Sequence, residues 1–139
     1  MNVWVNGCFD ILHTGHLDLL EFAKFTGNEL GNMFSNTLFV GIDSDRRVAE
    51  LKGEGRPINN QSDRKRFLKS LQIVEDVLIF DSDDELGYLI EQFDIDVMVV
   101  GDQYMNKEVI GSEGAKNGVI YFPVDERSTT NIIDKIKNT

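Results

Sequence analysis

The chain has 139 residues, 41% of them hydrophobic, which is typical of one globular domain with a single core. Its formal net charge of −10 argues against general binding to nucleic acid or to an anionic membrane. No apolar run approaches the roughly 18 residues that cross a membrane, and no basic and apolar leader opens the chain. One cysteine, Cys8, excludes an internal disulfide. We therefore expect a soluble cytoplasmic protein with one domain over residues 1–139 and no nucleic-acid or membrane partner.

The first stretch of chemical interest lies where an apolar run gives way to helical spacing. Residues 3–5 are typical of a buried strand, and apolar positions from Leu17 onward recur at the spacing of a helix. His13 and His16 therefore lie at a helix start, where unpaired N–H groups carry partial positive charge and favour phosphate. Gly15 between them leaves room for a ligand to approach the backbone. The two imidazoles, three residues apart, can offer neutral donors or imidazolium charge to one anion.

Other interpretations of this stretch have less support. A histidine pair can be half of a metal site or ordinary helix-start residues, but the chain holds no third histidine and no cysteine cluster. Cys8 lies in the same stretch, yet a thiol nucleophile needs a dedicated base. A small buried residue is therefore the simpler interpretation of Cys8.

Strands and helices alternate along the rest of the chain. The predicted elements are a loop over residues 27–36, a strand over 37–43, a helix over 44–51, a loop over 52–60, a helix over 61–71, a strand over 76–80, a helix over 83–93, a strand over 96–100, a short helix near 112–116, a strand over 119–122 and a final helix opened by 128–130. This alternation predicts an α/β fold, a Rossmann-like, doubly wound parallel sheet of five strands in the order 3-2-1-4-5 with helices on both faces.

The predicted topology places a ligand site without help from any motif. In open parallel sheets, ligands bind beyond the carboxyl ends of the strands where the strand order reverses, here between the first and fourth strands. The histidine pair follows the first strand, Gly101 and Asp102 follow the fourth, and residues 128–130 follow the fifth. A Gly-Asp pair or a capping Ser-Thr-Thr means little alone. Their shared location gives both weight.

Positive charge is concentrated in one segment of this acidic chain. Residues 46–69 hold eight of the 14 basic residues against three acids, a local balance of +5. A mobile cationic loop over residues 52–60 is suited to cover a triphosphate, and Arg64 at a helix start favours a bound anion. A solvated helix face is the simpler interpretation of three members of the segment, Arg46, Arg47 and Lys69.

The stretch over residues 7–16 resembles the signature Gly-X-Phe-Asp-X-X-His-X-Gly-His of the cytidylyltransferase-like nucleotidyltransferases. All fixed positions of the signature are present, namely Gly7, Phe9, Asp10, His13, Gly15 and His16. The likeness extends over nearly the whole chain. It includes a lysine-containing loop at 51–59, a triphosphate-binding arginine segment at 63–65, a Gly-Asp stretch at 101–104, a Gly-Ser stretch at 110–112 and a Ser-Thr-Thr motif at 128–133.

The resemblance implies transfer of a nucleoside monophosphate from ATP or CTP to a small phosphorylated acceptor, with release of pyrophosphate. It implies that the catalytic residues are His13, His16, Lys52 and Arg64. It implies that the nucleotide is bound by Gly7, Cys8, Phe9, Asp10, Gly15, Gly101, Asp102, Arg127, Ser128, Thr129 and Thr130. No side chain is expected to ligate a metal directly, because Mg²⁺ would bridge the phosphates with Asp10 as an outer-shell partner. Relatives commonly pair, so the resemblance also implies a homodimer.

Two branches of the family compete. The Lys-Gly-X-X-Arg-Pro-X-Asn loop and Ser-Thr-Thr-Asn-Ile-Ile resemble the adenylyltransferase domain of ADP-heptose synthases, which we favour. Glycerol-3-phosphate cytidylyltransferase is the alternative. The loop over 27–36 is longer than relatives have there, and the family's Arg-Thr-X-Gly-Ile is absent before Ser128, which leaves the base, the acceptor and the role of Arg127 open. Two other classes remain, a nucleotide-binding module without turnover and a flavin-binding electron carrier.

Overall fold

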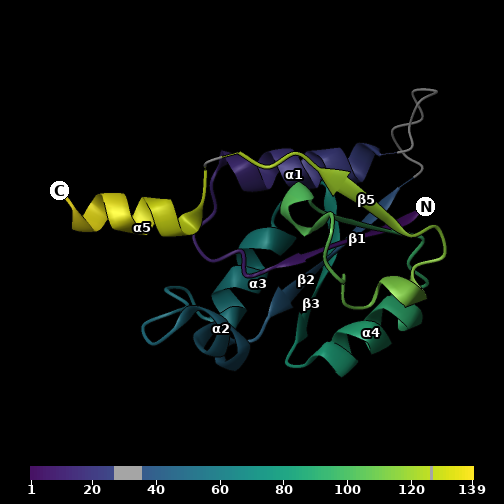
Figure 1. Cartoon of the computed structure of the whole chain (residues 1–139), viewed down its shortest axis with the longest axis horizontal. Helices are drawn as coiled ribbons and strands as arrows, with labels where there is room; N and C mark the ends of the chain where they lie inside the picture. The colour runs from purple at the N-terminus through teal and green to yellow at the C-terminus, as the bar shows by residue number, and fades with distance from the viewer. Residues whose placement is uncertain (27–35, 126) are drawn as a thin grey trace.

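A parallel sheet of five strands runs through the structure, with helices on both faces (Figure 1). This computed structural model describes residues 1–26, 36–125 and 127–139. The strands lie in the order β3-β2-β1-β4-β5 and all pair in parallel, which confirms the predicted doubly wound α/β fold. Their bounds are β1 Asn2–Gly7, β2 Thr37–Asp43, β3 Val74–Phe80, β4 Val97–Gly101 and β5 Val119–Phe122.

Short polar side chains cap four of the helices. Ser44, Asn60, Ser82 and Ser128 each accept a hydrogen bond from a backbone N–H in the first turn of the helix that follows. The α-helices are α1 Thr14–Phe25, α2 Asp45–Lys52, α3 Gln61–Lys69, α4 Asp83–Gln92 and α5 Thr129–Lys137. In the part of the chain that the structure describes, no helix has the length and apolar character to cross a membrane.

Two segments differ from the prediction. The helix expected near residues 112–116 is a single 3₁₀ turn, η2 (Ser112–Gly114), preceded by Gly111 in the left-handed region at φ 87°. Glycines at both ends of so short a segment oppose an α-helix. A second 3₁₀ turn, η1 (Asp102–Tyr104), directly follows β4. Residues 27–35 of the expected loop lie outside the described residues.

The core occupies both faces of the sheet because side chains along a strand alternate in direction. Val3 and Val5 of β1 pack with Leu20 of α1 on one face, whereas Trp4 packs against α4 on the other. Figure 1 shows α1 and α4 on opposite sides of the sheet. A side chain at Gly41 of β2 would overlap the indole of Trp4, so the fully buried tryptophan requires a glycine on the neighbouring strand.

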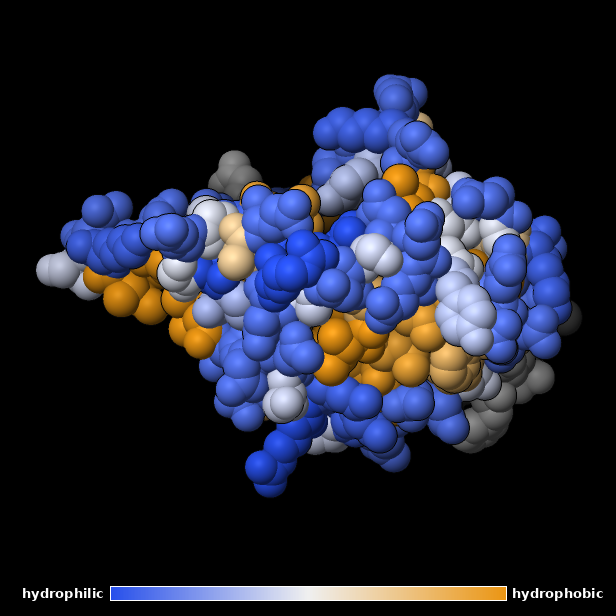
Figure 2. Space-filling model, turned by 90° about the horizontal axis from the view of Figure 1, so that it is seen from below, coloured by the Kyte–Doolittle hydropathy of each residue, from blue (hydrophilic) through white to orange (hydrophobic). Residues whose placement is uncertain are grey.

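Helix α5 projects from the body of the protein (Figure 1). None of its residues is fully buried, and Ile136 is 65% exposed. Ile132, Ile133 and Ile136 recur at helical spacing and give the helix one apolar face, visible at the left of Figure 2. A nine-residue helix has little stability by itself in water, so this face is suited to a further contact.

Arg64 of α3 lies in the interior, with 1% of its surface exposed. Its guanidinium donates to the carbonyls of Cys8, Asp43 and Asn59 and to the carboxylate of Asp45, at 2.8–3.0 Å. It therefore joins the loop after β1 to the end of β2 and to the loop before α3. The Arg64 side chain has no exposed surface and does not line the cavity described below. Four of its five N–H donors are engaged by the protein, so this structure favours a structural role, and the predicted contact with a triphosphate stays a prediction.

Replacing Arg64 with methionine keeps side-chain length and removes the donors. Three buried carbonyls then lose their partner, and we expect the free energy of unfolding to fall by about 3–5 kcal/mol. Urea denaturation followed by circular dichroism measures the change. Arg66→Met, an exposed position on the same helix, is the matched control and should change stability by less than about 0.5 kcal/mol. Equal midpoints for the two variants would contradict the structural role of Arg64.

Candidate active site

A cavity of about 630 Å³ lies at the carboxyl ends of the strands. Residues from the loops after β1, β4 and β5 line it together with residues from α2 and the start of α5. This is where the strand order reverses, as the topology predicted. All the predicted site residues line the cavity except Arg64 and Asp102.

The two histidines begin helix α1 as a reciprocal cap. His13 is the N-cap residue, and its Nδ1 accepts a hydrogen bond from the backbone N–H of Gly15 at 3.0 Å. In turn, Nδ1 of His16 accepts a hydrogen bond from the backbone N–H of His13 at 3.1 Å. A neutral imidazole whose Nδ1 accepts a hydrogen bond carries its proton on Nε2. The cap thus leaves each ring with Nε2–H as its donor beside the cavity.

Both rings are held neutral. Burial, with a smaller effect of His13, lowers the pKa of His16 to about 4. Burial, then the charge of Arg127, lowers the pKa of His13 below its usual value. The ring centroids are 3.9 Å apart, so a charge on one ring disfavours a charge on the other. Of the two options that the sequence left open, the structure favours neutral donors over imidazolium charge.

Gly15 has a different use from the one predicted. A Cβ at this position would lie 2.8 Å from Cε1 and 2.9 Å from Nδ1 of the His13 ring. The space beside the glycine is therefore filled by the imidazole that caps the helix, and the expected room for a ligand is absent here. The glycine is required because the ring of His13 folds back over it.

Asp10 anchors the loop that carries the basic residues. Its side chain is fully buried, and its carboxylate accepts hydrogen bonds from the backbone N–H groups of Ile58 at 2.7 Å and Asn59 at 2.8 Å. The Nε of Arg56 lies 3.4 Å away. Because these groups engage both oxygens, the structure gives Asp10 an anchoring role, and its outer-shell contact with Mg²⁺ stays a prediction.

Lys52 stands at the end of α2, just before this anchored loop, and lines the cavity. Gly53 and Gly55 follow it in the left-handed region, at φ 96° and 85°, with no atom of another residue within 4 Å of a Cβ placed there. Within the described residues, Lys52 makes no hydrogen bond or ion pair. Its ammonium group is thus available to an anion.

The β4 side of the cavity is shaped by backbone and apolar groups. Gly101 lines it, and a Cβ there would overlap the side chain of Gln103 and approach Val124 to 2.9 Å. Asp102 does not line the cavity, because its carboxylate turns back to accept from the N–H of Val124 at 3.3 Å. The expected contact of Asp102 with the nucleotide stays a prediction.

Arg127 enters the cavity from the segment between β5 and α5. Its guanidinium donates to Thr14 at 2.8 Å, to Asp18 at 2.7 Å and to Asp125. Hydrogen bonds to the two carboxylates raise the pKa of Arg127, and its hydrogen bonds lower the pKa of Asp125 to about 2. Arg127 thus joins α1 to the segment before α5. Because the two carboxylates offset its charge, it adds little net attraction for a phosphate.

The hydroxyl groups at the start of α5 differ in what they have left to donate. Ser128 accepts from the backbone N–H of Asn131, which leaves its own proton free to donate. Thr129 donates to the carbonyl of Ile11 at 2.7 Å, so its proton is engaged in holding the loop after β1. Thr130 makes no hydrogen bond within the described residues. Ser128 and Thr130 are therefore the donors that this turn offers to a ligand.

The sequence predicted a solvated helix face for Arg47, which instead lines the cavity, and it did not predict several other lining residues. Arg46 and Lys69 form exposed ion pairs as expected, but Arg47 is only 20% exposed and lines the cavity. Its spacing of four residues from Asp43, across a helix start, was the available signal. The lining also includes apolar residues that no motif marks, Val99, Val109, Ile110 and Phe122.

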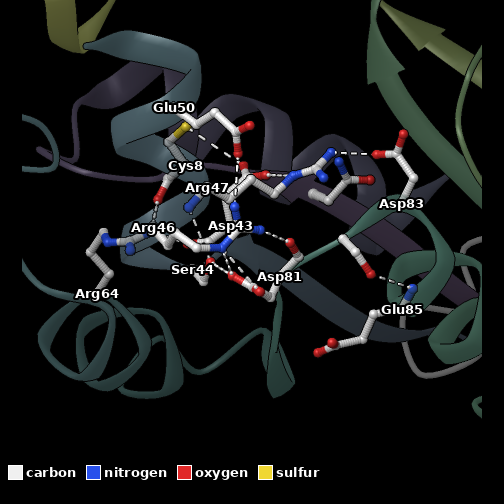
Figure 3. A network of polar contacts seen from close by, with 12 residues as sticks. Cys8, Asp43, Ser44, Arg46, Arg47, Glu50, Arg64, Asp81, Asp83 and Glu85 are labelled. Carbon is white, nitrogen blue, oxygen red and sulfur yellow. Dashed lines mark hydrogen bonds and ion pairs between the residues drawn. The ribbon is translucent and has the colours of Figure 1, made fainter. Parts of the chain in front are cut away.

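The surroundings of Cys8 disfavour a thiolate. Burial, then the charge of Asp43, raises the pKa of its thiol to about 11. The thiol points at Asp43, with 3.6 Å between sulfur and oxygen (Figure 3). A thiol with this pKa is mostly protonated at neutral pH, which disfavours a nucleophilic role.

A doubly wound sheet with a reciprocal histidine cap, a lysine and hydroxyl donors around one cavity is suited to binding a nucleotide. The chain belongs to the cytidylyltransferase-like family, whose model matches residues 4–135. The resemblance drawn from the sequence is thereby confirmed.

Relatives and solved structures agree with this assignment. The chain is 48% identical over 135 residues to the bifunctional protein HldE of Campylobacter fetus subsp. fetus (strain 82-40), and 43% identical over 137 residues to HldE of Helicobacter pylori (strain P12). These matches cover 97% and 99% of this chain but 28% of each relative, so the chain spans about a quarter of their length. The crystal structure of the lipopolysaccharide core biosynthesis protein from Thermoplasma volcanium GSS1 shares the fold, with a TM-score of 0.69 and 20% identity over 91% of this chain and 98% of that one.

The lowered pKa of His16 predicts how stability depends on pH. The folded value is about 4 and the ordinary value is 6.5, so between these values the unfolded chain binds a proton that the folded chain does not. Stability therefore falls as the pH drops from 6.5 towards 4, and this effect is absent above 6.5. His16→Gln removes the titration, and glutamine at the same position still reaches the N–H of His13 as a cap. Urea midpoints at pH 7 and pH 5 should differ less in the variant; equal differences would refute the assignment.

Proposed function

We propose that this protein transfers a nucleoside monophosphate from a nucleoside triphosphate to a small phosphorylated acceptor. A phosphate oxygen of the acceptor attacks the α-phosphorus, the bond to the β-phosphate oxygen breaks, and pyrophosphate leaves. The nucleophile is already an anion, so the reaction needs no general base. The site must supply position and compensation for the charge that develops on the phosphates.

The histidine cap carries this proposal. We propose that the Nε2–H groups of His13 and His16 donate hydrogen bonds to the phosphates. The hydrogen bonds from backbone N–H groups to the two Nδ1 atoms keep both rings oriented for this. Lys52 supplies the positive charge, because it has no carboxylate partner within the described residues. The hydroxyl groups of Ser128 and Thr130 donate to the triphosphate from the opposite side, and Gly101 borders the nucleoside.

Mg²⁺ fits this site as an ion that enters with the nucleotide. Within the described ranges, no group of three or more histidine, cysteine, aspartate or glutamate residues could hold a metal ion. Mg²⁺ keeps several waters and binds triphosphate oxygens readily, so it does not require a protein cage. Bound in this way, it would offset charge on the phosphates, while the histidines and Lys52 hold the same oxygens from the protein side.

A heptose-type sugar 1-phosphate is the acceptor that we favour, with ATP as the donor. Support comes from the HldE relatives at 42–48% identity and from the loop and Ser-Thr-Thr-Asn-Ile-Ile sequences, which resemble the adenylyltransferase domain of ADP-heptose synthases. Glycerol 3-phosphate with CTP is the alternative pair. A nucleotide-binding module without turnover is the alternative of another class.

Pyrophosphate release distinguishes these possibilities. ATP and CTP are each combined with a heptose 1-phosphate, other sugar 1-phosphates or glycerol 3-phosphate in the presence of Mg²⁺. We expect the fastest release from ATP with the heptose 1-phosphate, and no release without Mg²⁺. His16→Gln should retain the fold and lower turnover by about 10²–10³, the usual effect of losing one donor to the transition state. Nucleotide binding without pyrophosphate from any pair would favour the module.

We also propose that the protein is a homodimer and that α5 contacts the second copy. The helix carries the apolar face of Ile132, Ile133 and Ile136, and two lysines against one aspartate on an otherwise acidic chain.

Analytical ultracentrifugation tests this proposal. The wild-type chain should sediment as a dimer, and Ile136→Glu should give a monomer with an unchanged circular dichroism spectrum. Phe67→Glu is the matched control, because Phe67 is an apolar residue of similar exposure, 58%, on another helix, α3. A monomeric wild-type chain would end the proposal.

A further inference from the structure

The cavity extends to the β2 side of strand β1, away from the position proposed for the nucleoside. Strand β1 lies between β2 and β4, and the nucleoside is proposed to lie on the β4 side. On the β2 side, the lining consists of Asp43, Arg47, Leu51, Lys52 and Arg56. An acceptor that attacks from the face opposite the leaving pyrophosphate has this region available to it. The inference below therefore rests on the proposed function.

Three contacts fix Arg47 in this region, and Figure 3 shows the two with Asp43 and Asp83. Its Nε donates to Asp43 at 2.8 Å, and its Nη2 donates to Asp83 at 2.7 Å. The guanidinium carbon lies 5.3 Å from the centre of the Phe80 ring. These contacts hold the guanidinium in one orientation, so little conformational entropy remains to be lost when it binds a ligand.

These contacts leave one donor of Arg47 and one acceptor of Asp43 for a ligand, and both residues line the cavity. Nη1 of Arg47 makes no hydrogen bond within the described residues. Asp43 is 9% exposed, and its Oδ2 receives only the weakly donating thiol of Cys8 at 3.6 Å. A free N–H donor therefore lies beside a carboxylate oxygen with unused acceptor capacity.

The charge of this cluster favours hydroxyl groups over phosphate. Asp43 and Asp83 together carry two negative charges against one on Arg47, so the cluster is negative overall. A phosphate meets repulsion there and is better placed near Lys52. Sugar hydroxyls both donate and accept, which matches an adjacent carboxylate and guanidinium.

We propose that Asp43 and Arg47 form the acceptor-binding pair of this enzyme. They hydrogen-bond the hydroxyl groups of a polyhydroxylated sugar phosphate whose phosphate lies towards Lys52 and the histidines. A site built to pair with hydroxyls discriminates against an acceptor that leaves its polar groups unsatisfied. The pair therefore selects a sugar phosphate over the shorter glycerol 3-phosphate.

Steady-state kinetics of Arg47→Gln test the assignment, with Arg46→Gln as the matched control. Arg46 is the preceding residue on α2, but it pairs with Asp81 and Glu50 at the surface and does not line the cavity. In Arg47→Gln, the KM for the sugar 1-phosphate should rise by about 10–100-fold. The KM for the triphosphate should stay within about twofold of wild type. The preference for the sugar phosphate over glycerol 3-phosphate should fall in parallel, and Arg46→Gln should leave all three quantities unchanged.

The possible outcomes separate this inference from the proposed function. If wild-type protein releases pyrophosphate but Arg47→Gln keeps its acceptor KM, the inference is wrong and the proposed function stands. If the variant raises both KM values equally, or loses turnover together with thermal stability, Arg47 is a structural tie between α2 and α4 and the inference is also wrong. No pyrophosphate from any pair with wild-type protein refutes the proposed function itself. Should Arg47→Gln fail to fold, Arg47→Lys retains the charge without the free Nη1 and should raise the acceptor KM by about tenfold.

Discussion

The hydrogen bonds from the backbone N–H groups of His13 and Gly15 to two imidazole Nδ1 atoms determine most of what this site can do. They cap α1, and they also fix the tautomer of both rings, because an Nδ1 that accepts a hydrogen bond has no proton to give. Together with the bond from His16 N–H to the carbonyl of His13, they engage three of the N–H groups at this helix start. The two Nε2–H groups are the donors that the rings keep for a ligand.

This arrangement explains how an acidic chain can accommodate a polyanion with few free charges. Arg47, Arg56 and Arg127 line the cavity but are each paired with carboxylates, and Arg64 is buried behind it. Among the cations of the lining, Lys52 alone has no ion pair within the described residues. Attraction for phosphate from the protein side then depends on oriented neutral donors and one lysine. Oriented donors in a partly enclosed site need little reorganisation during the reaction.

The sequence predicted the sheet order and the location of the site because both depend on local patterns. Apolar runs alternate with amphipathic segments, and the histidines fall within ten residues of the first strand. The roles of individual arginines were harder to predict. Arg64 is buried because carbonyls from two distant loops converge on it, and Arg47 lines the cavity because Asp43 and Asp83 hold it there. Such contacts depend on tertiary structure, and local charge patterns describe them poorly.

The side chains at the two ends of the cavity are oriented by contacts other than those of the histidine cap. The histidine cap depends on backbone groups of α1, whereas the Asp43 and Arg47 pair depends on the end of β2 and the first turn of α2. The β4 side is lined by apolar groups such as Val99 and Ile110 and by backbone at Gly101. Within the described residues, the side chains of Asp43 and Arg47 make no hydrogen bond to either imidazole, so they can change without removing a bond that orients the rings. A fold with this separation can keep one phosphoryl-transfer centre while its acceptor and base preferences vary, since specificity lies in groups that the centre does not need for its own geometry.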